Sequence, residues 1–572
     1  MCTRKKQSSG KISEFKVRNI VIMLVLALFV PQIYPTASAE KILSRIKRKM
    51  LLSGELSAEI QYDDVTGADQ NRPRWVQSLH LTSGLGLLGI PLGKINLNFS
   101  SFDTDFRRPF NGLNIHLSRN WAEAYLGDSN PKYSKYTLNG IHVRGGSVDL
   151  KPGHVNLAFT LGRIQKANRA NDSNEPDFKQ YLYGMNIGVG TTGNSQVHLS
   201  LVKINDYPNP DSSTASLNQA ENLVAGLDGV LHLFKSKLKL KGELAGSAFS
   251  RDITSPAVEI SEDVRGIATN LFKPRISSQY DLAFYLDSEF RLSNGKFKLY
   301  LVNVGPDFNS LGVPDIHSDE RKFGGILDQA LLTKKIRFKT GLDLAHDNLS
   351  DLKRSTMTNF SGLLNTSFVF IKYPIVTFGY RFKTQADDND DDDSLNVDNI
   401  NQTLNLGLSQ QYGIMNLRGN YSLNYSLGWF RDNSPLANPG IDYDFHSLNA
   451  LGNTRLNIPV ILHLGFGWSQ NIYDNNGGDD RRWRYKLGVT YKPMVSRFST
   501  TAYIDYDLGK LNDSQNHSRT RRWSYSIRSE YRINNTSASC KIERIRFNKK
   551  PQKAENYREL LIKLAFNQRF WE

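Results

Sequence analysis

Cysteines and long apolar runs are scarce in this sequence of 572 residues. The two cysteines, Cys2 and Cys540, cannot build a disulfide framework, and they form no CxxC pair for a metal site. Beyond the N-terminal region, no apolar stretch approaches the roughly 20 residues that a transmembrane helix needs, and the mean hydropathy is −0.44. These absences exclude a disulfide-rich scaffold and a helical membrane bundle.

Aromatic residues and glycine, by contrast, are abundant, with 29 Phe, 25 Tyr, 7 Trp and 43 Gly. So many rings exclude a disordered chain, and together with the glycines they favour a large all-β protein. The formal net charge is +16, but no nucleic-acid-binding motif accompanies it. We therefore assign the charge to a lumen or to a surface that faces lipid headgroups, and we expect no nucleic-acid partner.

The N-terminus has the pattern of an export signal. A basic stretch, residues 1–19, precedes eleven apolar residues, Ile20–Val30, and the small-residue triplet Ala37-Ser38-Ala39. Eleven apolar residues cross only about half of a ~30 Å hydrocarbon core, which argues against a membrane anchor. We predict a signal peptide at residues 1–39, removed during Sec-type export, and a short periplasmic segment at residues 40–51.

From residue 52 onward the sequence alternates between apolar and polar residues. In Trp523–Ile533, for example, Trp523, Tyr525 and Ile527 share one face and the other face is polar. Tight turns alternate with longer polar loops, which is expected of an outer-membrane barrel and not of a string of secreted β-sandwiches. We therefore predict an all-β fold over residues 52–572. It is a closed transmembrane antiparallel β-barrel of about 26 strands (range roughly 22–26), with short periplasmic turns and long extracellular loops.

Aromatic residues mark the expected membrane boundaries. Four tryptophans lie near strand ends beside long loops, where an interfacial girdle belongs: Trp429, Trp468, Trp483 and Trp523. The last strand, Glu555–Glu572, ends in Phe570-Trp571-Glu572. This ending is similar to the C-terminal signal of outer-membrane barrels, although Glu572 follows the terminal ring. Outer-membrane lipid and the barrel-assembly machinery are therefore expected partners.

The segment Trp121–Leu150 is the most distinctive part of the chain. If Val143 and Val148 both face outward, the alternation changes phase between them, and the intervening Gly145-Gly146 is the natural place for a β-bulge. The predicted bulge and lumen-facing polar cluster comprise His142, Arg144, Gly145, Gly146 and Asp149. This cluster would fix a loop or contact cargo, or it would form a purely structural network in the lumen.

A barrel of this size would leak solutes unless its lumen is narrowed or closed. Only residues 40–51 separate the predicted cleavage site from the first strand, so we expect no plug domain there. We expect inward-folded loops, led by Gly305–Arg321 and Arg251–Ser278, with a flattened barrel or a periplasmic plug or accessory protein as alternatives. The candidate plug-loop residues are Pro306, Asp307, Phe308, Leu311 and Pro314.

Two stretches, Trp121–Leu150 and the irregular Gly305–Gly312, resemble recurrent segments of large Gram-negative outer-membrane barrels of the porin type. More faintly, they are similar to the barrel of the type IX secretion translocon. The resemblance implies a transmembrane barrel in the outer membrane and carries over no functional residue.

An acidic run at residues 387–393 is a weak candidate for a metal site. Ca²⁺ prefers clustered carboxylates, which are here Asp387, Asp388, Asp390 and Asp392. The run lacks the central glycine and closing glutamate of an EF-hand loop, so a solvated, self-repelling loop is the favoured alternative. Among the 11 histidines, no spacing indicates a catalytic pair. We therefore expect neither an enzyme nor a bound cofactor.

The sequence thus favours a pore or transporter for solutes in the bacterial outer membrane. The alternative is a non-conducting barrel for assembly, secretion or surface attachment, working with a periplasmic or surface partner. An outer-membrane enzyme is a third class.

Overall fold

The computed structural model describes most of the chain after residue 49. The described residues are 50–68, 73–87, 90–102, 112–165, 178–191, 193–208, 219–258, 271–370, 372–388, 396–434, 442–474, 478–493, 497–512, 517–551 and 555–570. The predicted signal peptide and most of the predicted periplasmic segment lie outside them. The first strand begins at Met50, two residues before the predicted start of the barrel.

The structure contains 26 strands. Their bounds are β1 Met50–Thr66, β2 Trp75–Leu87, β3 Ile90–Ser100, β4 Gly112–Arg119, β5 Ala122–Ser129, β6 Val143–Leu150, β7 Val155–Gln165, β8 Phe178–Gly190, β9 Gln196–Pro208, β10 Glu221–Leu233, β11 Leu238–Ser250, β12 Ser278–Leu292 and β13 Gly295–Val304. They continue as β14 Glu320–Leu331, β15 Ile336–His346, β16 Met357–Phe368, β17 Ile375–Asp387, β18 Asp398–Ile414, β19 Leu417–Asp432, β20 Tyr443–Arg455, β21 Val460–Tyr473, β22 Asp479–Tyr491, β23 Phe498–Asn512, β24 His517–Ile533, β25 Thr536–Lys550 and β26 Tyr557–Phe570.

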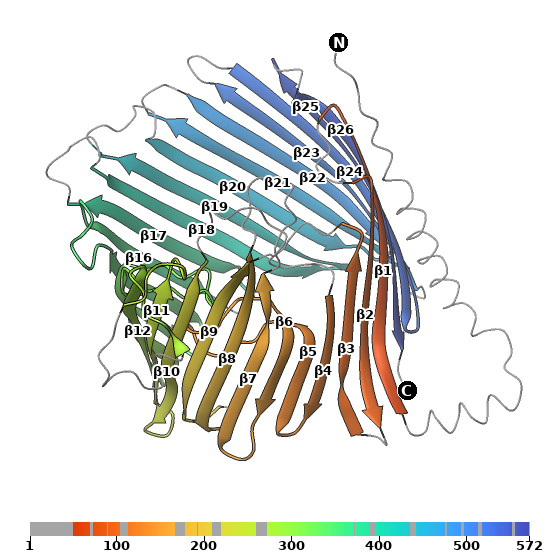
Figure 1. Cartoon of the computed structure of the whole chain (residues 1–572). Coiled ribbons are helices and arrows are strands. Elements are labelled where there is room, and N and C mark those ends of the chain that lie inside the picture. Colours follow the sequence, from red (N-terminus) through yellow and green to blue (C-terminus); the bar gives the residue numbers. More distant parts are fainter. Residues whose placement is uncertain are drawn as a thin grey trace, which may run out of the picture.

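Each strand pairs antiparallel with the next one in sequence, and β1 pairs with β26, so the sheet closes on itself. Figure 1 shows this ring, in which the red first strand lies beside the blue last strand. Closure leaves no unpaired sheet edge, which is the condition for a β-structure to cross a bilayer. The predicted fold and strand number are confirmed.

Short and long connections alternate around the barrel. Two-residue turns such as 293–294 and 534–535 lie at one end, and connections such as 251–277 and 305–319 lie at the other. We call these the short-turn end and the long-loop end. Both described chain ends, Met50 and Phe570, lie at the short-turn end, because β1 starts there and β26 finishes there.

The outer face of the barrel carries exposed apolar side chains. Leu227 on β10 lies opposite Leu244 on β11, and each side chain is 52% exposed. The neighbouring positions Ala245 and Ala283, which point the other way, are fully buried. An apolar outer face on a closed sheet is the surface that lipid contacts.

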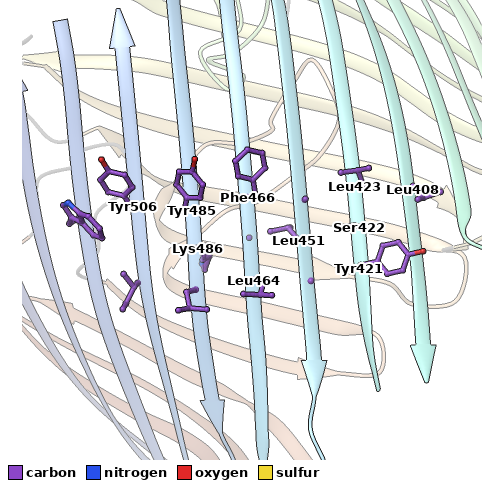
Figure 2. A pocket seen from close by; sticks show the side chains of 16 residues that line it. Leu408, Tyr421, Ser422, Leu423, Leu451, Leu464, Phe466, Tyr485, Lys486 and Tyr506 are labelled. Carbon is purple, nitrogen blue, oxygen red and sulfur yellow. The ribbon is translucent and has the colours of Figure 1, made fainter. Parts of the chain in front are cut away.

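Aromatic rings form a row on this outer face across β21 to β24. The rings of Phe466 and Tyr485 are 5.5 Å apart, those of Tyr485 and Tyr506 are 6.3 Å apart, and those of Tyr506 and Trp523 are 4.2 Å apart. Figure 2 shows Phe466, Tyr485 and Tyr506 side by side on consecutive strands. Such a row is typical of a membrane interface. Among the described residues, no helix is long and apolar enough to cross a membrane.

Candidate functional site

Two connections from the long-loop end lie against the inner face of the barrel wall. They are residues 130–142, between β5 and β6, and residues 305–319, between β13 and β14. Their central side chains are inaccessible to solvent, with Tyr136 1% exposed and Leu138 and Phe308 0% exposed. We call these segments the first and second inward loops.

Apolar side chains of both loops pack on inward-facing residues of the wall. Tyr136 and Phe308, whose ring centroids are 5.9 Å apart, form one buried cluster with wall residues of β10 to β13: Val224, Ala245, Ala283 and Val304. Leu138 forms a second cluster with Val143, Ile164, Leu182, Val202 and Ile204 on β6 to β9. Burial of large rings and branched side chains contributes about 1.5–3 kcal/mol each, so these contacts hold the loops inside.

A buried carboxylate of the wall fixes the first inward loop. Glu243 on β11 is 4% exposed. Its Oε1 accepts hydrogen bonds from Ser134 Oγ at 2.6 Å and from the Tyr136 backbone N at 3.0 Å, and its Oε2 accepts one from the Lys135 backbone N at 2.9 Å. Three donors on one carboxylate offset the cost of taking its charge out of water.

The second inward loop is held by side chains of β10 and β11. Asn222, which is 1% exposed, donates from Nδ2 to the Asn309 carbonyl oxygen at 3.0 Å. Its Oδ1 accepts from the Leu311 backbone N at 2.9 Å. Ser247 Oγ also donates to the Asn309 carbonyl oxygen. The buried wall amide therefore pairs with two backbone groups of one loop turn.

The two inward loops also contact each other. The Asn139 backbone N donates to the Gly312 carbonyl oxygen at 3.0 Å, and Ser310 Oγ donates to the Thr137 carbonyl oxygen at 3.5 Å. A Cβ at Gly312 would lie 2.4 Å from the Thr137 oxygen, so only glycine allows this approach. Each loop therefore supports the position of the other.

A third connection braces the end of the second inward loop. Asp319 accepts hydrogen bonds from the backbone N atoms of Asn348 and Leu349, and its Oδ2 lies 2.5 Å from Lys353 Nζ. Burial of the Asp319 carboxyl raises its pKa, but the hydrogen bonds from Lys353, Leu349 and Asn348 outweigh burial and leave the pKa below its usual range. At neutral pH the carboxylate therefore links loops 305–319 and 347–356.

The five candidate plug residues occupy different positions within the second inward loop. Phe308 is its buried anchor, Leu311 packs against the second apolar cluster, and the Asp307 backbone N donates to Asp281 Oδ2 on β12 at 2.8 Å. Pro306 is half-buried and Pro314 is exposed. The described parts of the other expected loop, Arg251–Ser278, contact the outer face of the wall instead. The buried Phe272 packs against Tyr280 on β12, and Lys203 Nζ on β9 donates to the Leu271 carbonyl oxygen. Tyr280 and Lys203 have the outward parity of Leu282 and Leu199, so the inward fold expected for this loop is not found in its described part.

The predicted β-bulge at Gly145-Gly146 is wrong. β6 pairs with β5 and with β7 in unbroken register through both glycines. Val143 is 0% exposed on the inner face and Val148 is exposed on the outer face, so the alternation does not change phase. The prediction failed because it assigned Val143 to lipid, whereas this side chain packs under the first inward loop.

The predicted polar cluster is divided between two places. His142 Nε2 lies 3.0 Å from Asp128 Oδ1, and Arg144 Nε donates to the same oxygen at 2.6 Å. Asp149 instead pairs with Lys151 Nζ at 2.8 Å. The sequence prediction missed Asp128, because this residue lies on the preceding strand. Its partners, His142 and Arg144, were predicted to face the lumen together with Asp149.

The acidic run shows no metal-binding geometry in its described part. Asp387 Oδ1 accepts from the Val397 backbone N at 3.1 Å, and Asp388 Oδ1 accepts from the Thr356 backbone N at 2.5 Å. Asp390 and Asp392 lie outside the described residues. Among the residues that are described, no cluster of three or more His, Cys, Asp or Glu side chains could hold a metal ion.

Closure of 26 strands and a lipid-facing apolar surface define the protein as a bacterial outer-membrane β-barrel. No protein-family model and no curated protein matches the sequence. Several solved structures share similarity with it at low identity. OccK9 (OpdG) of Pseudomonas aeruginosa is 13% identical over 66% of this chain and 98% of that chain, with a TM-score of 0.29.

Two further solved structures give similar values. A BenF-like porin of Pseudomonas fluorescens is 12% identical over 67% of this chain and all of that chain (100%), with a TM-score of 0.30. OccAB3 of Acinetobacter baumannii is 11% identical over 66% of this chain and 99% of that chain, with a TM-score of 0.28.

Proposed function

We propose that the protein is an outer-membrane pore for small solutes, whose lumen is narrowed by the two inward loops. The observation that supports this most is the fixed position of these loops. Glu243 and Asn222, both buried in the wall, hold the loop backbones against the inner face of β6 to β13. A barrel of 26 strands has a wide interior, and loops fixed in this way restrict it without a separate plug domain.

The inner face of β15 to β26 is polar, as expected of a water-filled passage. On β18, β19 and β20, Asn405, Asn424 and Asn449 occupy inward positions and are exposed. Ser426 Oγ, also inward, donates to Asn405 Oδ1 at 2.6 Å. We propose that solutes pass along this side of the lumen.

The charges on this inner face favour anionic solutes. Arg381 and Lys383 on β17 and Arg528 on β24 point inward, and none has an ion-pair partner within the described part of the chain. The inward cations of β22 are instead paired, for example Arg484 Nε with Asp507 Oδ1 at 2.6 Å. Cations left without a carboxylate attract anions into a water-filled channel. The proposal includes no catalytic step.

Single-channel recording of refolded protein in planar bilayers tests the proposal. We expect steady conductance and, in a salt gradient, a reversal potential that indicates anion preference. Deleting Pro306–Pro314 removes the buried centre of the second inward loop and should raise the conductance severalfold. The control deletion, Asp390–Asp393, shortens another connection at the same end and should leave the conductance unchanged.

The competing hypothesis is a non-conducting barrel that works with a periplasmic or surface partner. A silent wild-type protein that copurifies in fixed stoichiometry with another protein would favour that alternative. Migration that differs between boiled and unboiled samples in SDS shows that each variant has folded, since a closed barrel resists SDS. We also propose that insertion into the membrane depends on the barrel-assembly machinery.

A further inference from the structure

Four cations form a row on the outer face near the long-loop end of β22 to β25. Arg481 lies directly opposite Lys510, Lys510 lies opposite Arg519, and Arg519 lies opposite Lys550. All four side chains are exposed. They share the parity of the exposed lipid-facing residues Tyr485, Ile504, Tyr525 and Ile542 on the same strands.

The orientation of this row is supported by a contact with the aromatic row. Lys510 Nζ lies over the ring of Trp483, 5.6 Å from its centre. Trp483 is opposite Trp468 on the same outward face as Tyr485. The cations therefore point away from the lumen, toward the region that the membrane surface occupies.

Like charges directly opposite one another destabilise a sheet. Arg481 is compensated by Asp479, which is itself held by Asn512. Within the described residues, Lys510, Arg519 and Lys550 have no carboxylate at ion-pair distance. Three adjacent cations that have no counter-charge among the described residues favour an anion bound from outside the protein.

The same cations line a pocket of about 580 Å³, together with Asn512, His517 and Ser518. An apolar depression of about 750 Å³ lies on the same outer face, and its lining includes Leu464, Phe466, Tyr485, Leu487, Tyr506 and Trp523 (Figure 2). Lys510 is four residues from Tyr506, and Arg519 is four residues from Trp523, which corresponds to about 13 Å along a strand. A cationic pocket thus borders an apolar groove in the direction of the membrane core.

We propose that this surface binds a phosphate-bearing lipid of the outer leaflet. The phosphate lies among Lys510, Arg519 and Lys550, and an acyl chain runs along the groove beside Tyr506 and Trp523. Arg546, opposite Trp523, and Arg558, opposite Arg546, extend the basic surface toward β26. The occupant is a membrane lipid and not a free anion, because the pocket and the groove lie on one lipid-facing surface. The proposal requires the long-loop end of the barrel to face the cell exterior. It does not depend on whether the barrel conducts.

Binding of lipid A to the refolded barrel in neutral detergent, measured by native mass spectrometry, tests the proposal. The variant K510Q/R519Q/K550Q should bind bis-phosphorylated lipid A roughly 100-fold more weakly, because each cation near an anionic surface contributes about fivefold. The single variant R519Q should show about a fivefold loss. The control R482Q/R522Q/R528Q removes three cations from the inward face of β22 and β24 and should bind like the wild type.

Two probes distinguish the sources of the phosphate. Dephosphorylated lipid A should bind the wild-type protein as weakly as bis-phosphorylated lipid A binds the triple variant. Inorganic phosphate at the same concentration should not displace the lipid. Equal losses in the outer and inner triple variants, tight binding of the dephosphorylated lipid, or displacement by inorganic phosphate would each overturn the proposal.

Discussion

Two parts of the barrel wall differ in what their inner faces contact. We call the inner face of β6 to β13 the covered wall and that of β15 to β26 the open wall. The covered wall presents apolar residues to the lumen, among them Val143, Val224 and Ala283, and the inward loops bury them. The open wall presents polar residues at equivalent positions, such as Asn405 and Asn424.

The difference shows that the contents of the lumen decide which residues point inward. Where water fills the lumen, the strands follow the rule of apolar residues outward and polar residues inward. Where a protein segment fills the lumen, both faces of a strand need apolar side chains, so apolar and polar residues no longer alternate along it. Buried carboxylates and amides on the covered wall, such as Glu243 and Asn222, then pair with loop backbone instead of water.

The largest effect is expected from removing the carboxylate that holds the first inward loop. Glu243→Ala leaves Ser134 Oγ and two backbone N–H groups without their acceptor and should weaken loop closure by about 2–4 kcal/mol. We expect a higher mean conductance and frequent transitions between levels in single-channel recordings. The matched control is Glu543→Ala on the open wall, where the carboxylate accepts from Ser524 Oγ and Lys541 Nζ.

Glu543→Ala should leave the conductance level nearly unchanged, since this carboxylate holds no inward loop. Similar recordings from both variants would mean that the covered wall does not control the passage. Wild-type-like heat stability of the folded band in SDS gels would show that neither variant alters the barrel itself.

The general architecture could be predicted from the sequence because it depends on local patterns. Alternation and connection lengths predicted about 26 strands and a closed sheet. The apolar character of Gly305–Gly312 and the width of the lumen predicted the inward position of Phe308. The first inward loop was missed. Its signal was present, since Tyr133, Tyr136 and Leu138 lie in a connection that would otherwise expose them to water.

Pairings between distant strands could not be predicted in this way. Glu243 occupies an ordinary polar position between Gly242 and Leu244 in the sequence, and nothing local indicates that three donors from residues 134–136 reach it. Asp128 was overlooked for the same reason, because its contact with Arg144 depends on the register between β5 and β6.

A second prediction distinguishes two adjacent glycines of β6, of which Gly145 faces inward and Gly146 outward. A Cβ at Gly145 would lie 2.1 Å from the Leu161 carbonyl oxygen, whereas the nearest atom to a Cβ at Gly146 is 3.8 Å away. Gly145→Ala should therefore destabilise the barrel by roughly 1–3 kcal/mol and lower the refolding yield, while Gly146→Ala should be tolerated.

Among the strands that form the open wall, the outward-facing Gly452 on β20 provides the comparison. Nothing lies within 4 Å of a Cβ at this position, so Gly452→Ala should refold like the wild type. The yield is measured from the ratio of folded to unfolded bands in unboiled SDS samples. If Gly146→Ala lowered the refolding yield as much as Gly145→Ala, the result would favour the predicted β-bulge at Gly145-Gly146 over the continuous register.

The smallest expected effect is a dependence of loop closure on acidic pH. Because the pKa of Asp319 in the folded protein lies below its usual range, the Asp319 carboxylate stabilises the braced loop above the unfolded-state pKa of about 4. This stabilisation is lost as the pH falls through the lower, folded-state value. Lys353 stays protonated throughout, since its hydrogen bonds to Asp319 and Asp347 raise its pKa.

Channel recordings should thus show more frequent transitions to higher conductance as the pH falls below about 4. Asp319→Asn cannot form the charged contact with Lys353, and its single amide oxygen can replace only one of the two carboxylate oxygens that accept from the backbone N atoms of Asn348 and Leu349. This variant should show a moderate level of such transitions already at neutral pH and little further change on acidification. If the frequency of these transitions depended on pH in the same way in the wild type and in Asp319→Asn, the acid-sensitive group would be a residue other than Asp319. Since loss of one brace at the end of the loop leaves Phe308 and Asn222 in place, the change should be smaller than that caused by Glu243→Ala.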